Sequence, residues 1–113
     1  MTMTNIVVAN AFSLNMMNLE VGITNLQVCP TCPEFIREEI EAAGGFTSIV
    51  GHADTAAIFS SLLGLDVPCN RATLLMDEGT TLFVGQYKGP RLPEGATNLP
   101  EGAKVEWAMV LIA

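Results

Sequence analysis

Two segments of this chain carry the full pattern of an amphipathic helix, and each is followed directly by glycine. The first, Pro33–Ala43, begins with proline, has acidic residues in its first turns and runs into Gly44. Proline suits the first position of a helix and glycine the position after its end, so both boundaries are predicted. The second, Ala53–Leu63, ends at Gly64. The predicted core-facing residues are Phe35, Ile36 and Ile40 in the first helix and Ala56, Ile58, Phe59, Leu62 and Leu63 in the second.

Short β-rich runs supply the strands of a sheet that these helices would cover. We expect strands at Asn5–Ala9, Val21–Val28, Ala72–Met76, Thr81–Tyr87 and Val105–Ile112. The turn Asp77-Glu-Gly-Thr80 predicts a hairpin between the third and fourth of them. The stretch between Lys88 and Lys104 predicts a long loop, of the kind that often forms a lid. Together these patterns predict an α/β fold, one small domain over residues 1–113 with a mixed β-sheet flanked by helices.

Charge and apolar content limit what such a domain binds. The 113 residues carry 5 Lys and Arg against 12 Asp and Glu, for a net charge of −7. Binding to duplex nucleic acid depends on neutralising many phosphates, and five cations exclude it. Arg71, Lys88 and Arg91 nevertheless predict a local positive pocket for a small anion. Hydrophobic residues make up 50% of the chain, which predicts a subunit interface with the Val105–Ile112 strand as a contributor.

The cysteines leave two alternative functions open. Cys29-Pro-Thr-Cys32 lies between a predicted strand and a predicted helix, as a thioredoxin-like dithiol would. With His52 and Cys69 the same pair would make a tetrahedral zinc set, of which only the first half has typical spacing. Three cysteines are an odd number, unlike a secreted disulfide framework. No apolar run is long enough to span a bilayer, so we expect a cytoplasmic protein that does not contact membranes.

The single histidine lies at the predicted start of the second helix, in Gly51-His52-Ala-Asp-Thr55. A helix N-terminus offers free N–H groups and the positive end of a dipole, so a phosphate binds readily beside this imidazole. Imidazole exchanges protons near neutral pH, and a carboxylate such as Glu94 would favour its charged form. The pattern favours general acid catalysis on a phosphodiester.

Four motifs, taken in order, resemble one protein family along nearly the whole chain. They are A-N-A-F-S-L-N-M at Ala9–Met16, T-S-I-V-G-H at Thr47–His52 with Thr55, Asn70-Arg71, and R-L-P-E-G at Arg91–Gly95. They are similar to the viral type III anti-CRISPR ring nucleases and their bacterial relatives. The resemblance implies a small α/β homodimer that degrades cyclic tetra-adenylate, the second messenger of type III CRISPR systems, without a metal or other cofactor.

The resemblance also implies roles for individual residues. His52 would protonate the leaving 5′ oxygen, while Arg91 and Arg71 would grip phosphates with planar guanidinium groups. Glu94 would orient His52 or the ribose hydroxyl. Contacts to the nucleotide are implied for Asn10, Ser13 and Asn15 in the N-terminal loop and for Gln86. The chain departs from the family pattern at Tyr87–Pro90, which is one residue longer.

The implied reaction is intramolecular. The ribose 2′-OH attacks its own 3′ phosphate, which leaves a 2′,3′-cyclic phosphate and a free 5′-OH. This step needs in-line geometry, neutralised phosphoryl oxygens and a proton for the leaving group. A C2 dimer would place two sites on opposite phosphates of the ring and yield linear di-adenylates. A non-catalytic cyclic-nucleotide-binding module, which would leave the ring intact, is the alternative from another class.

Overall fold

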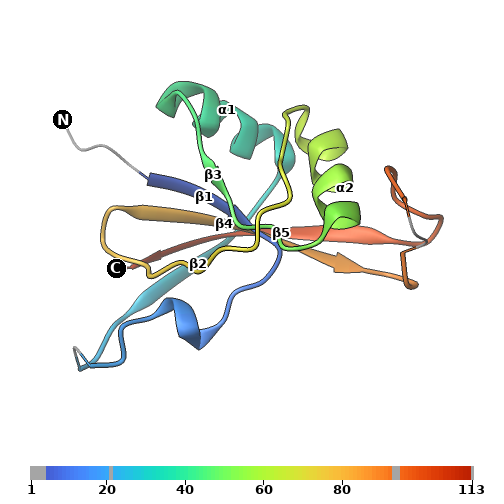
Figure 1. Cartoon of the computed structure of the whole chain (residues 1–113). Helices are drawn as coiled ribbons and strands as arrows, with labels where there is room; N and C mark the ends of the chain where they lie inside the picture. Colours follow the sequence, from blue (N-terminus) through green and yellow to red (C-terminus); the bar gives the residue numbers. More distant parts are fainter. Residues whose placement is uncertain (1–4, 21, 93–94, 113) are drawn as a thin grey trace.

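A computed structural model describes residues 5–20, 22–92 and 95–112 of the chain. A mixed 5-stranded sheet with the strand order β2-β5-β4-β1-β3 forms its centre, and both helices lie on one face of that sheet (Figure 1). The single small α/β domain expected from the sequence is confirmed. The elements are β1 (Asn5–Ala9), a 3-10 helix η1 (Leu14–Met16), β2 (Leu26–Thr31), α1 (Pro33–Ala43), β3 (Thr47–Ser48), α2 (Ala53–Leu63), β4 (Thr80–Lys88) and β5 (Lys104–Ile112).

The direction of the strands decides where loops gather. β1 runs parallel to both of its neighbours, pairing Val7 with Thr47 of β3 and with Leu82 of β4. The remaining pairs, β4 with β5 and β5 with β2, are antiparallel. The carboxyl ends of β1, β3 and β4 therefore lie at the same end of the sheet. In open α/β sheets, ligands bind at this end of the strands.

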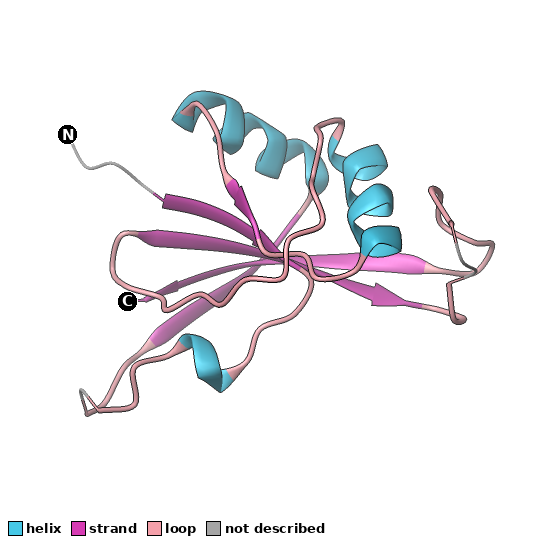
Figure 2. Cartoon of the chain, in the orientation of Figure 1, coloured by secondary structure: helices cyan, strands magenta, loops and turns pink. Residues whose placement is uncertain are grey.

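Each face of the sheet has its own apolar core. Residues alternate along β1, so Ile6 and Val8 face the helices while Val7 and Ala9 face the opposite side. Loop segments and the short 3-10 helix η1, rather than α-helices, cover the opposite side (Figure 2). Buried residues of the helix-side core include Ile36, Ile40, Ile58, Phe59, Leu63, Phe83 and Trp107. Those of the opposite core include Met17, Ile49, Met76, Leu82 and Val110.

A glycine in the middle of β4 lets two large rings close over the helix-side core. The rings of Phe59 and Trp107 lie 4.7 Å apart between centroids. A Cβ added at Gly85 would come within 2.6 Å of atoms in both rings. Gly85 is therefore required at this strand position by close packing.

Both predicted helices are confirmed with the expected boundaries. Gly44 and Gly64 follow them in the left-handed conformation, at φ 84° and 69°, which glycine adopts without a steric penalty. Phe35, which was predicted on the core face, lies at the margin of the core. It is 39% exposed and contacts Phe83 edge to face at 6.4 Å. No helix in the described part of the chain is long and apolar enough to cross a membrane.

Two of the predicted strands are corrected by the structure. The second strand covers Leu26–Thr31 rather than Val21–Val28, because its register is set by pairing Leu26 with Ile112 of β5; Val21 itself lies outside the described residues. The segment Ala72–Met76 forms no strand. It crosses the face opposite the helices, where the Met76 N–H donates to the Met16 carbonyl oxygen at 2.7 Å and the Met76 side chain is buried.

The predicted hairpin at Asp77–Thr80 is therefore wrong, although the turn itself exists. The Asp77 carboxylate accepts the Gly79 N–H at 2.9 Å and the Thr80 hydroxyl at 3.0 Å, which is the local bonding expected of an aspartate in a turn. The turn leads into β4, whose antiparallel partner is β5 on the far side of loop 89–103.

Candidate functional site

The short strand β3 continues into a segment that is bonded to residues 68–70. The Ser48 hydroxyl donates to the Pro68 carbonyl oxygen at 2.6 Å. Asn70 donates its backbone N–H to the Val50 carbonyl and its side-chain N–H to the Ser48 carbonyl, both at 2.8 Å. These bonds hold the backbone before His52 against the backbone before Arg71. The motifs Thr47–His52 and Asn70-Arg71, far apart in sequence, are thus brought side by side.

Gly51 joins three of the predicted site residues. Its N–H donates to the Asn10 side-chain oxygen at 3.4 Å, and its carbonyl oxygen accepts from Arg71 Nε at 2.9 Å. Asn10 directly follows β1, so its bond with Gly51 lies at the carboxyl end of the parallel strands. The bond uses only Nε of Arg71, and the donors on the terminal guanidinium nitrogens remain for a ligand. Asn10 and Arg71 are therefore both bonded to the residue that precedes His52.

His52 is the N-cap residue of α2. Its backbone is extended, with φ −127° and ψ 131°, and its carbonyl oxygen accepts the Ala56 N–H at 2.9 Å. The imidazole makes no capping hydrogen bond and is exposed. The first turn of the helix thus brings its backbone N–H groups and the positive end of its dipole next to the imidazole, an arrangement that favours an anion.

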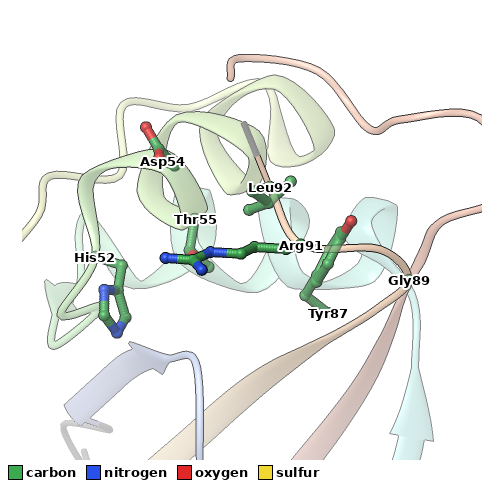
Figure 3. Close-up of a pocket in the computed structure, with 7 residues that line it drawn as sticks. All are labelled: His52, Asp54, Thr55, Tyr87, Gly89, Arg91 and Leu92. Atoms are coloured by element: carbon green, nitrogen blue, oxygen red, sulfur yellow. The ribbon is translucent and has the colours of Figure 1, made fainter. Parts of the chain in front are cut away.

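His52 and Arg91 line one cavity of about 660 Å³ at this end of α2. This volume lies within the range of small-molecule sites. Arg91 extends across the cavity with its guanidinium at the His52 end (Figure 3). Asp54 secures the loop that carries Arg91, because its carboxylate accepts the Gly95 N–H at 3.1 Å. The complete lining is His52, Asp54, Thr55, Tyr87, Gly89, Arg91 and Leu92.

Gln86 is not part of this cavity. Because side chains alternate along β4, Gln86 lies on the sheet face opposite Tyr87, next to Glu106 of β5. There it contributes to a separate shallow hollow of about 300 Å³, lined also by Val28, Val84 and Ala108. Gln86 and His52 therefore do not share a cavity within one chain.

Four other predicted residues, Asn10, Ser13, Asn15 and Arg71, do not line the cavity. Ser13 and Asn15 are exposed around η1, where the Ser13 carbonyl oxygen accepts the Met16 N–H at 3.0 Å. Neither lines the cavity of His52 and Arg91. Glu94 lies outside the described residues.

The sequence interpretation missed Asp54, Tyr87 and Leu92 as lining residues. The position of Asp54 in the first turn of the second helix, close to His52, could have indicated it. Tyr87 could have been found from side-chain alternation in the strand, which places it on the face opposite Gln86.

The positive charge at the site comes from arginine rather than lysine. Lys88, which the sequence grouped with Arg71 and Arg91, pairs with Glu106 at 2.8 Å. Lys104 approaches the same carboxylate at 3.4 Å. Hydrogen bonds from Lys88 and then Lys104 hold the pKa of the Glu106 carboxyl below its ordinary value. Lys88 is therefore engaged on the Gln86 side of the sheet. Of the three predicted cations only Arg91 lines the cavity, while Arg71 is bonded to Gly51, the residue before His52.

The cysteines do not form either of the alternative sites. Cys29 lies within β2, Cys32 is the extended N-cap of α1, and both are exposed and free. At a rise of about 3.3 Å per residue, their Cα atoms lie about 10 Å apart, beyond the reach of a disulfide. Among the described residues, no three His, Cys, Asp or Glu side chains gather to hold a metal. Cys29, Cys32, His52 and Cys69 are thus not one ligand set.

Comparisons with known proteins agree with this architecture. Among solved structures, B116 of Sulfolobus turreted icosahedral virus matches with a TM-score of 0.77 and 24% sequence identity, over 95% of this chain and 98% of that chain. This likeness concerns the fold. No curated protein matches the sequence. The family model described as STIV B116-like matches residues 6–106, and the chain therefore belongs to the STIV B116-like family.

Proposed function

We propose that this protein is a metal-independent ring nuclease that cleaves cyclic tetra-adenylate and so switches off type III CRISPR signalling. One observation carries the proposal: His52 and Arg91 share a single cavity at the N-terminus of α2. Arg71 supports it, since it is bonded to Gly51, the residue before His52. A proton donor, guanidinium groups and a helix N-terminus are what a phosphodiester transesterification requires.

Each group has a distinct role in the proposed step. The ribose 2′-OH releases its proton to solvent water as its oxygen bonds to the adjacent phosphorus, and the bond from phosphorus to the 5′ oxygen breaks. Arg91, Arg71 and the N–H groups of α2 stabilise the charge on the phosphoryl oxygens. His52 donates its proton to the leaving 5′ oxygen. Glu94 is proposed to orient His52 or the ribose hydroxyl. The products carry 2′,3′-cyclic phosphate and 5′-OH ends.

A homodimer is part of the proposal, because a ring with four phosphates is too large to bind within the cavity of one chain. The sheet face opposite the helices offers a surface for the second copy around the hollow of Val28, Val84 and Ala108. β5 lies inside the sheet between β2 and β4, so it contributes through this face and not through an edge. Gln86 borders the same hollow, and a ring shared by two copies would meet Gln86, Ser13 and Asn15 outside the His52 cavity.

The decisive experiment incubates the purified protein with radiolabelled cyclic oligoadenylates of several ring sizes in EDTA and resolves the products by size. We expect cyclic tetra-adenylate to disappear through a transient linear tetramer into linear di-adenylates with 2′,3′-cyclic phosphate ends. A ring that is bound but left intact would instead identify a binding module. Cleavage only after added divalent metal, or mononucleotides as the main product, would contradict the mechanism.

If the proposal holds, the natural setting of the reaction is the cytoplasm of an infected host cell. The relation to a viral protein favours this anti-defence role over clearance of the signal by the host itself.

A further inference from the structure

The cavity beside His52 has two chemically different sides. His52 and Arg91 offer a proton donor and a cation, which suit a phosphate. Tyr87 and Leu92, from the end of β4 and the loop that follows, offer an aromatic ring and an aliphatic side chain to the same cavity. A phosphate gains no favourable contact from these apolar groups. They indicate that the ligand brings an apolar part as well.

The Tyr87 ring is held in place by the turn that follows it. Its hydroxyl donates to the Pro90 carbonyl oxygen at 2.5 Å. A Cβ added at Gly89 would lie 3.1 Å from that hydroxyl and 2.6 Å from the Ala103 side chain, so glycine lets the turn close over the ring. Because the hydroxyl is already bonded, what Tyr87 presents to the cavity is its ring. The ring stands between the β4 backbone and Arg91, with a flat side toward Arg91 and His52 (Figure 3).

We propose that a purine base stacks on the ring of Tyr87 while its phosphate lies between His52 and Arg91. Tyr87 then selects the nucleobase, and the two basic groups hold the phosphate. The inference rests on the proposed function, since it names the part of the nucleotide that the same cavity recognises. Every base has a π-face, and stacking on an aromatic side chain contributes enough that its loss weakens binding about tenfold. Purines offer the larger ring to such a contact.

A pair of variants separates the ring from the hydroxyl. Tyr87→Leu removes the ring and keeps an apolar side chain, whereas Tyr87→Phe removes only the hydroxyl. We expect Tyr87→Leu to raise the KM for cyclic tetra-adenylate about tenfold, with a smaller effect on kcat, and Tyr87→Phe to raise it clearly less. Phe35→Leu, at a half-exposed aromatic outside the cavity, is the matched control for loss of an aromatic side chain. Equal losses in both Tyr87 variants would assign the effect to the bond with Pro90 and overturn the proposal.

The second readout does not depend on cleavage. The chain contains one tyrosine, so ring-labelled tyrosine reports on Tyr87 alone by NMR. Adenosine 5′-monophosphate, added to millimolar concentration, is expected to shift the ring signals upfield, and uridine 5′-monophosphate to shift them less. Ring signals that do not move with adenosine 5′-monophosphate would overturn the stacking proposal, even where cyclic tetra-adenylate is cleaved. Shifted signals without any cleavage would retain the stacking site and reject the ring nuclease.

Discussion

His52 is an unusual residue for the position it holds. N-cap residues are most often Ser, Thr, Asn or Asp, whose side chains bond to free N–H groups of the first turn. His52 makes no such bond, so α2 begins without side-chain capping. A residue that is suboptimal for local stability is expected where function requires it. Here the imidazole makes no capping bond and is therefore available to a ligand.

This geometry allows a test in which stability and activity move in opposite directions. We expect His52→Asn to lower the single-turnover rate of cyclic tetra-adenylate cleavage about 10²- to 10⁴-fold, as loss of a general acid does. The same change supplies a preferred cap, so the thermal unfolding midpoint should stay constant or rise. Binding of the ring, measured by equilibrium titration, should survive. Turnover at the wild-type rate would rule out His52 as the acid.

For single residues, the sequence predicted proximity in the site best where a residue directly follows a strand or directly precedes a helix. Asn10 does so after β1 and His52 before α2. Arg71 lies between α2 and β4 in neither position, and its hydrogen bond to the Gly51 carbonyl oxygen brings it there. Gln86 could not be placed in the same way, because one residue of register in β4 decides which face a side chain lies on. Ser13 lies in a loop, where no periodicity constrains it.

Among the elements, helices and strands differ in how far local sequence determines them. α1 and α2 were predicted with their boundaries because proline, the apolar stripe and the closing glycine all lie within the segment. Strands depend on partners that are distant in sequence. Ala72–Met76 reads as a strand and precedes a real turn, yet β4 pairs with β1 and β5 instead.

The packing of β4 under α2 can be tested at Gly85. Gly85→Ala would place a methyl group 2.6 Å from atoms of Phe59 and Trp107, and overpacking of this kind destabilises a core by about 1–3 kcal/mol. We expect a lower urea midpoint. Gly79→Ala is the matched control, because its added Cβ makes only a 3.4 Å contact with the Asp77 carboxylate. Equal midpoints for the two variants would show that both rings move aside without cost.

On the scale of the molecule, a surface opposite the helices stays open. Val28 in β2 is 64% exposed at the margin of the hollow shared with Val84 and Ala108. Apolar surface of this kind marks interaction sites, and the proposed second copy would cover it in a self-complementary interface. The sequence predicted such an interface from composition and named the Val105–Ile112 strand as a contributor. It could not say which face of that strand is involved, because this requires knowing which strands are internal.

We expect the wild-type protein to sediment as a dimer and Val28→Glu as a monomer with reduced cleavage, because the variant would bury a carboxylate in the interface. Gln27→Glu adds the same charge on the same strand but on the other face of the sheet, and it should leave the dimer intact. Sedimentation velocity and the cleavage assay measure both effects. A fully active monomer would contradict the shared-ring model.

The central position of β1 has a consequence for how the protein is made. Val7 pairs with Thr47 on one side and with Leu82 on the other, so during synthesis the β3 partner of β1 emerges well before its β4 partner. Such distant pairing raises contact order and slows folding. One edge of β1 stays open until β4 has been synthesised, and until then Tyr87 and Arg91 cannot join His52 at the cavity. The site therefore comes into being late, as one of the final products of folding.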